Sequence, residues 1–106
     1  MNDIKAWQGD TIPLTATSPD ETATSATLLI GAVGEEAVFT KTENFTDGIV
    51  DLTITDEENI EANIPVGEHK YMIQIVYSDG SELTFPQPDS CDLSELPNFV
   101  IQERIE

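Results

Sequence analysis

Most of the chain alternates apolar and polar residues with a period of two, the pattern of a β-strand with one buried face. In the first such stretch, Ile12, Leu14 and Ala16 fall on one side and threonines fall on the other. Pro13 interrupts this stretch, and because proline has no amide hydrogen, it indicates an edge strand or a break between two short strands. Residues 26–33 are apolar on both faces, which predicts a central strand covered on both sides.

Two later stretches predict the core of the fold. Residues 49–55 place apolar side chains on one face and polar side chains on the other, and residues 68–77 form the longest predicted strand. Successive side chains of a strand point to opposite faces, so each stretch defines one inward set. The side chains expected to be buried are Val50, Leu52, Ile54, Tyr71, Ile73 and Ile75.

Two Asp-Gly pairs predict tight turns between these strands. Asp47-Gly48 precedes the strand at residues 49–55, and Asp79-Gly80 is expected at the tip of a two-residue hairpin loop. The hairpin then returns as an antiparallel strand, and a last strand is expected near the C-terminal end, around Phe99.

One segment breaks the β-pattern. Thr55 and Glu58 have the spacing of a capping box at the start of a helix. Ile60 and Ile64 are four residues apart, so we expect one or two helical turns that lay both side chains over the open end of the core, with Pro65 ending the segment.

About seven strands, tight turns and one short helical turn predict an all-β fold, an immunoglobulin-like antiparallel β-sandwich. The length of 106 residues fits a single domain spanning residues 1–106. The chain has no apolar run long enough to span a membrane, and its N-terminal residues lack the basic and apolar segments of a signal peptide. We therefore expect synthesis in the cytoplasm.

The net charge of the chain limits the kinds of partner that it is expected to bind. The chain has 21 acidic and 4 basic residues, a formal net charge of −17. Phosphate backbones are contacted by lysine and arginine, so binding to nucleic acid or to an anionic membrane is not expected. The acidity fits solubility, docking to a basic protein surface, bridging by divalent cations, or mimicry of DNA.

Candidate chemistry is sparse. Trp7, within the sequence WQGDT, is expected to pack in the core or in an interface, although an exposed tryptophan beside polar groups would suit sugar stacking. We interpret His69 as a surface histidine. Cys91 is the only cysteine, so the chain cannot form an internal disulfide. Nothing in the sequence places His69 beside Cys91 as base and nucleophile. Clusters of acidic residues lack the spacing of an EF-hand, so we expect no enzyme activity, cofactor or metal.

The order of these motifs along the chain is similar to that of a known protein family. The stretch WQGDTIPLTAT, the stretch from DGIVDLTIT through the second Asp-Gly hairpin to ELTF, and a final FVI together resemble the immunoglobulin-like N-terminal domain of phage baseplate upper proteins and related phage structural modules. In that family a glycine leads quickly from the hairpin into the last strand, whereas this chain inserts PQPDSCDLSELPN. The resemblance implies a structural protein of the virion, at the tail or baseplate or decorating the capsid, that contacts other phage proteins and can contact further copies of itself.

The expected mechanism is docking. The loop acids Asp89, Asp92 and Glu95 are expected to set orientation and association rate, while an apolar or strand-edge contact at Phe99 and Ile101 supplies most of the affinity. Two other functions stay open at this point. One is an acidic DNA mimic that inhibits a nucleic-acid-binding protein, and the other is a carbohydrate-binding module.

Overall fold

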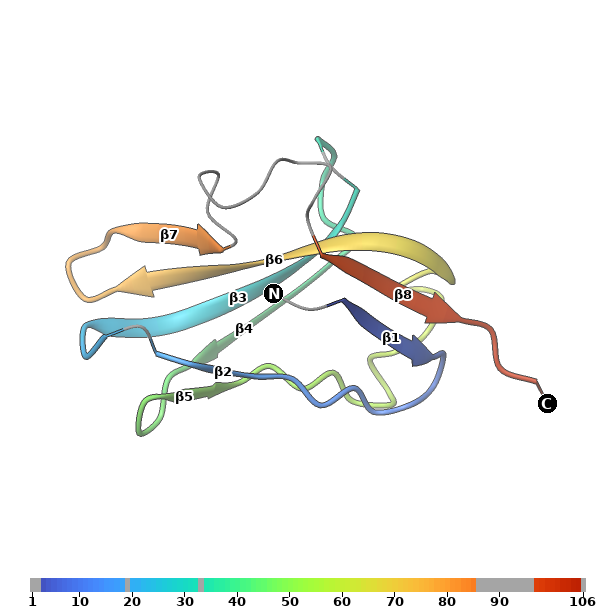
Figure 1. The fold of residues 1–106 in the computed structure, drawn as a ribbon, viewed down its shortest axis with the longest axis horizontal. Coiled ribbons are helices and arrows are strands. Elements are labelled where there is room, and N and C mark those ends of the chain that lie inside the picture. Colours follow the sequence, from blue (N-terminus) through green and yellow to red (C-terminus); the bar gives the residue numbers. More distant parts are fainter. Residues whose placement is uncertain (1–2, 19, 33, 86–96, 106) are drawn as a thin grey trace.

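The computed structural model describes residues 3–18, 20–32, 34–85 and 97–105 of the chain. That part of the protein is all-β and contains no helix (Figure 1). Its strands are β1 (Ile4–Trp7), β2 (Thr15–Thr17), β3 (Ala23–Gly31), β4 (Phe39–Asn44), β5 (Ile49–Asp51), β6 (Gly67–Tyr77), β7 (Glu82–Phe85) and β8 (Asn98–Gln102).

The strands form one large and one small sheet. The large sheet has six strands in the order β1-β8-β6-β3-β4, with β7 also paired to β6, and the small sheet consists of β2 and β5. In Figure 1 the two strands of the small sheet lie side by side, below the strands of the large sheet. This arrangement is compatible with the predicted β-sandwich.

The large sheet is mixed, which corrects the expectation of a purely antiparallel fold. β1 pairs with β8 in parallel, with Ile4 opposite Phe99 and Trp7 opposite Gln102, whereas every other described strand pair is antiparallel. The alternation of side chains is the same in both kinds of pairing, so it holds no information about the direction of a neighbouring strand.

The core lies between the inner face of the large sheet and the small sheet. All six side chains predicted from the alternation are buried, and Tyr71 meets Phe99 edge to face with ring centroids 6.1 Å apart. Among the described residues, the hydrophobic side chains that form the core are Ile12, Ala26, Leu28, Ile30, Val50, Leu52, Ile54, Ile64, Tyr71, Ile73, Ile75, Tyr77, Phe99 and Ile101.

The predicted break at Pro13 is confirmed. Ile12 forms an isolated bridge to Ile54, and β2 begins only at Thr15. Between them the Leu52 amide donates to the Leu14 carbonyl at 2.8 Å. Pro13 itself is exposed, and the residues on either side of it, Ile12 and Leu14, make the backbone hydrogen bonds to the opposite segment.

Both Asp-Gly pairs form turns. Asp47 and Gly48 have φ angles of 52° and 80°, and Thr46 and Ile49 exchange two backbone hydrogen bonds around them, as in a type I′ hairpin turn. At the second hairpin the Tyr77 amide donates to the Ser81 carbonyl, so the loop has three residues and not the expected two. Gly80 takes the left-handed conformation, φ 88°, that such a three-residue loop requires.

The segment from Thr55 to Ile64 forms two separate single turns, closed by the Asn59 amide on the Thr55 carbonyl and by the Ile64 amide on the Ile60 carbonyl, and no continuous helix. The capping box forms as predicted: the Glu58 amide donates to Thr55 Oγ1, and the Thr55 amide donates to Glu58 Oε1. Ile64 is buried as expected, but Ile60 is 44% exposed, which corrects its predicted place over the core. The side chain that points inward beside Ile64 is the fully buried Asn59.

Candidate functional site

The large sheet has a second face, turned away from the core. The pairing register assigns each side chain to one face, because neighbours across a ladder point to the same side. We call the face opposite the core the outer face. Its residues are Lys5, Trp7, Ser25, Thr27, Leu29, Thr40, Thr42, Asn44, Glu68, Lys70, Met72, Gln74, Val76, Glu82, Thr84, Asn98, Val100 and Gln102.

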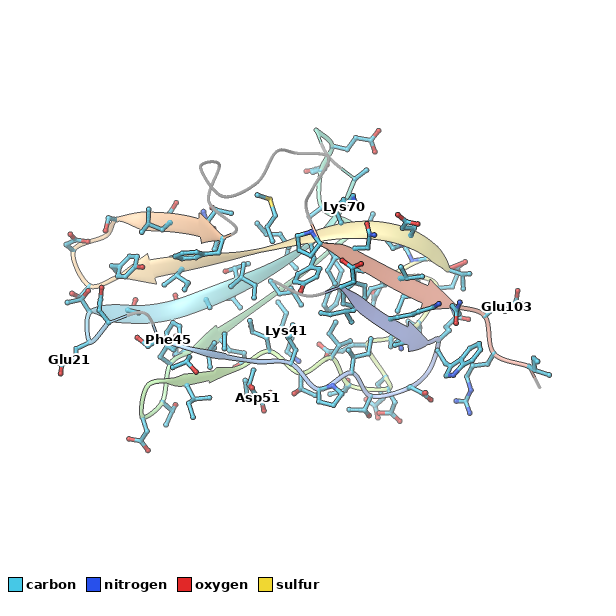
Figure 2. All side chains as sticks on the ribbon, viewed as in Figure 1. Glu21, Lys41, Phe45, Asp51, Lys70 and Glu103 are labelled. Atoms are coloured by element: carbon cyan, nitrogen blue, oxygen red, sulfur yellow. The ribbon has the colours of Figure 1, made fainter. Side chains whose placement is uncertain are left out.

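Charge is sparse and balanced on the outer face. Its charged side chains are Lys5, Lys70, Glu68 and Glu82, so it has no net charge in a chain of net charge −17. Among the residues that the structure describes, most acidic side chains lie outside the strands. Figure 2 shows Glu21 and Glu103 toward opposite ends of the molecule, with Lys70 between them along the long axis. The fold therefore separates a neutral face from an acidic periphery.

Polar side chains on this face bond laterally to their neighbours. Thr27 Oγ1 and Thr42 Oγ1 are 2.8 Å apart across β3 and β4. Lys70 Nζ donates to Asn98 Oδ1 at 2.5 Å across β6 and β8. Side chains held in this way lose little further conformational freedom when a partner covers them.

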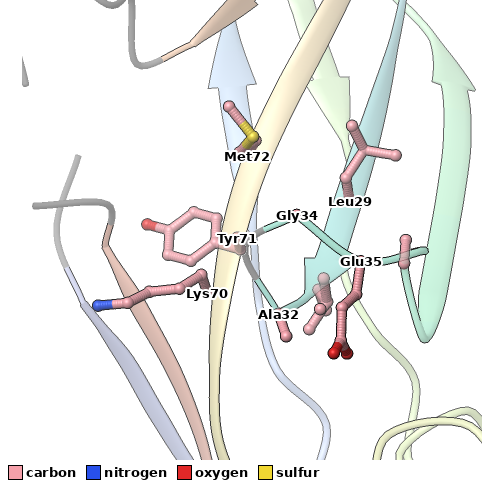
Figure 3. Close-up of a pocket in the computed structure, with 10 residues that line it drawn as sticks. Leu29, Ala32, Gly34, Glu35, Lys70, Tyr71 and Met72 are labelled. Carbon is pink, nitrogen blue, oxygen red and sulfur yellow. The ribbon is translucent and has the colours of Figure 1, made fainter. Parts of the chain in front are cut away.

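A pocket of about 260 Å³ opens beside the connection between β3 and β4 (Figure 3). Leu29 and Met72, which are paired across β3 and β6, contribute apolar side chains to its lining. Gly31 allows the returning chain to pass close by, since a Cβ atom there would lie 3.0 Å from Ala37 Cα. Glu35 and Lys70 also line the pocket.

The WQGD stretch forms a turn that closes on Asn59. The Asp10 amide donates to the Trp7 carbonyl at 3.2 Å, and Gly9 has a φ of 89°. Asn59 Nδ2 donates to the carbonyls of Trp7 and Asp10, both at 2.9 Å, and the Gly9 amide donates back to the Asn59 carbonyl. The stretch is therefore a turn at the end of β1. It is held by the side chain of Asn59, which lies 52 residues after Trp7 and 49 residues after Asp10 in the sequence.

Trp7 does not pack in the core. Its side chain is 49% exposed at a corner of the outer face, so the core half of the expectation is wrong, while packing in an interface stays a prediction. Exposure also meets the first condition for sugar stacking. Close by, Arg104 Nη1 lies 3.4 Å from Asp10 Oδ1. Gln8 Nε2 and Asn59 Oδ1 are buried without a hydrogen-bond partner among the described residues.

The sequence alone does not identify Asn59 as a structural residue. It follows Asp56, Glu57 and Glu58 in a polar run, and asparagine in such a run is typical of a solvated turn. Its role depends on backbone carbonyls far away in the chain, so no local signal reveals it.

A charged pair joins the two layers at the side of the core. Lys41 of β4 donates through Nζ to the Thr53 carbonyl at 2.6 Å and to Glu58 Oε1 at 2.7 Å. Figure 2 shows Lys41 between the large sheet and the small sheet. The Lys41 ammonium, followed by the Thr55 amide, holds the pKa of the Glu58 carboxyl below its ordinary value.

This lowered pKa predicts a pH-dependent contribution to stability. A carboxyl with a depressed folded-state pKa stabilises the fold above its unfolded pKa of about 4.3, and the contribution is lost as pH falls through the folded value. We expect Glu58→Gln to lower the free energy of unfolding by about 1 kcal/mol at pH 7 and by less at pH 3. Urea denaturation at both pH values measures the difference. The exposed neighbour Glu57, changed to Gln, should cost less than about 0.5 kcal/mol, and an equal loss for Glu58→Gln at both pH values would contradict the pairing.

The residues considered for catalysis and metal binding do not assemble a site in the described part of the chain. His69 Nε2 lies 2.7 Å from the Pro65 carbonyl oxygen, and Cys91 is outside the described residues. Among residues 3–18, 20–32, 34–85 and 97–105, no group of three or more histidine, cysteine or acidic side chains could hold a metal ion. The same residues include no helix long and apolar enough to cross a membrane.

The predicted docking residues divide into two groups. Asp89, Asp92 and Glu95 lie outside the described residues. Phe99 and Ile101 are 0% and 1% exposed, which corrects the expectation that their side chains offer an apolar docking edge. β8 is paired with β1 on one side and with β6 on the other, so its apolar side chains fill the core and both of its backbone edges are engaged.

No protein-family model and no curated protein matches the chain. The class of protein is therefore defined by its architecture, an all-β domain with a mixed six-stranded sheet and a second, two-stranded sheet. Its most distinctive surface is the neutral outer face.

Proposed function

We propose that this protein is a non-enzymatic docking module, an immunoglobulin-like structural subunit of a phage virion. The observation that supports docking is the outer face, a sheet surface without net charge on a strongly acidic chain. A partner would cover this face, and the acidic turns and tails would meet basic side chains around it. Tail or baseplate attachment and capsid decoration are both consistent with this function.

The physical argument concerns the cost of removing water. Burying an unpaired charge is expensive, whereas burying hydroxyls, amides and aliphatic side chains that keep their hydrogen bonds is not. Leu29, Met72, Val76 and Val100 provide apolar area among such groups. Acidic side chains at the periphery would steer a basic partner and select against acidic ones.

The virion assignment rests on the resemblance of the chain to phage immunoglobulin-like modules. The order of WQGDT, the threonine-rich strand and the second Asp-Gly hairpin supports it, and the layered all-β architecture is compatible with it. In this proposal the protein is made in the host cytoplasm and binds other virion proteins.

Purified particles test the proposal. We expect mass spectrometry to detect the protein in virions, and we expect it to resist stripping by rising NaCl, because apolar contacts are not weakened by screening. Met72→Lys on the outer face should reduce the amount retained on particles at least about tenfold, the effect of placing one charge in a dry contact. Ile49→Lys is the matched control, since Ile49 is 52% exposed and lies in the small sheet.

Asp92→Asn with Glu95→Gln should slow association at low salt and leave the retained amount unchanged at high salt. Absence of the protein from virions at every salt concentration would overturn the structural proposal. The DNA-mimic function would then predict a tight complex with a host nucleic-acid-binding protein and loss of its DNA binding.

A further inference from the structure

We propose that the pocket beside Leu29 and Met72 receives one aliphatic side chain from a partner protein whose surface around that side chain is basic. This inference rests on the proposed docking function and identifies the anchor point on the outer face. It also states the chemistry of the partner.

The size and lining of the pocket suit a single apolar side chain. Its volume is about 260 Å³, larger than the roughly 150 Å³ of an apolar cavity that holds benzene. Leu29, Met72, Ala32 and Ala37 supply apolar atoms to the lining. An inserted aliphatic group would therefore exchange water for carbon contacts on several sides.

The wall of the pocket is built by defined backbone contacts. The Val38 amide donates to the Ile30 carbonyl at 2.8 Å, and the Glu35 amide donates to the Ala32 carbonyl at 3.2 Å. Gly31 lets this connection lie against β3, where a side chain would collide with Ala37. The described residues on either side of these two hydrogen bonds need less ordering on binding than residues without such bonds.

Charge around the pocket selects the partner. Glu35 lines the pocket and the exposed Glu36 follows it, so two carboxylates lie near one ammonium, that of the lining Lys70, which donates to Asn98. Figure 3 shows the side chains of Glu35 and Lys70 extending in different directions from the pocket. A second copy of this chain, with a net charge of −17, would place its own acidic periphery against the acidic periphery around this face, so a basic surface is complementary and a second copy is not.

Tripeptide probes test the pocket without the natural partner. We expect acetyl-Lys-Leu-Lys-amide to shift the amide NMR signals of Leu29, Gly31, Gly34 and Met72 with a dissociation constant on the order of 1 mM. Acetyl-Glu-Leu-Glu-amide should bind about fivefold more weakly at low salt, and the two should converge at high salt. Acetyl-Lys-Gly-Lys-amide should leave these signals unmoved. Equal binding of the leucine and glycine peptides, or no shift with any peptide, would overturn the inference.

A filling variant gives the second test. Ala37→Met lengthens a side chain that lines the pocket, and Ala62→Met makes the same change at an exposed alanine far along the chain. We expect Ala37→Met to abolish the leucine-dependent shifts and to reduce retention on particles at least about tenfold, with Ala62→Met behaving as wild type. The folded state of both variants is checked by their amide spectra away from the pocket.

The two proposals fail in different ways. Wild-type protein missing from virions while the Lys-Leu-Lys peptide binds would overturn the virion function and support the pocket. Retention of Ala37→Met on particles at the wild-type level would overturn the pocket as an anchor and leave the docking function standing. A wild-type dimer in sedimentation that Ala37→Met disrupts would overturn the basic partner in favour of a second copy.

Discussion

Ile73→Ala is expected to lower the free energy of unfolding by about 2–5 kcal/mol, the range for truncating a well-packed core side chain. Ile73 lies in β6 opposite Leu28 of β3 on one side and Phe85 of β7 on the other, on the buried face. The change removes apolar contacts and leaves a cavity that neighbouring strands fill only in part. Urea denaturation followed by far-UV circular dichroism measures the loss.

Ile105→Ala is the matched control, because Ile105 is 95% exposed. Its effect should stay within about 0.5 kcal/mol, as for most surface substitutions. If Ile73→Ala cost no more than this control, the inward face of β6 would be assigned incorrectly. The assignment of the outer face would then fail with it, since both depend on the same alternation.

Asn59→Ala is expected to cost about 2–3 kcal/mol, because a buried amide is lost together with its two hydrogen bonds. Those bonds hold the carbonyls of Trp7 and Asp10, and through them the end of β1. The variant should unfold at lower urea concentration, and hydrogen exchange at the Gly9 amide, which donates to the Asn59 carbonyl, should be accelerated. The fluorescence of Trp7, the only tryptophan, reports on structural change at the end of β1.

Asn63→Ala is the comparison for this residue. Asn63 donates one bond, to the Glu58 carbonyl five residues earlier, so its loss should cost about 1 kcal/mol. Asn59→Asp should be worse than Asn59→Ala at pH 7, because a carboxylate would face two carbonyl oxygens, and it should recover part of its stability in acid. An Asn59→Ala variant as stable as Asn63→Ala would mean that the turn does not depend on Asn59.

The candidate site shows where reasoning from the sequence stops. The outer face gathers residues from six strands, and its neutrality exists only once those strands are neighbours. Phe99 and Ile101 are predicted to dock, yet an alternating strand fits a core as well as an apolar edge. In the structure β8 is paired on both sides, and the side chains of Phe99 and Ile101 are buried in the core. The pocket depends on the close passage of Ala37 over Gly31, which the sequence does not indicate.

Local chemistry alone determined much of this protein. The period of two identified the inward residues of β5 and β6 and the buried positions that follow β5, the Asp-Gly pairs marked two turns, and Thr55 with Glu58 formed the capping box. These features follow from residues close together in the chain, whose conformational preferences act before any tertiary contact forms.

Long-range contacts decided the rest. Three features depend on contacts between segments tens of residues apart. They are the parallel pairing of β1 with β8, the exposure of Trp7, and the inward position of Asn59 in place of Ile60. A strand edge accepts a parallel or an antiparallel neighbour with the same side-chain alternation. A buried amide is favourable only where distant carbonyls meet it. The sequence therefore determined which residues face inward in β6 and in residues 50–54, and the packing of the two sheets decided which surface is left neutral, because only that packing places the strands side by side.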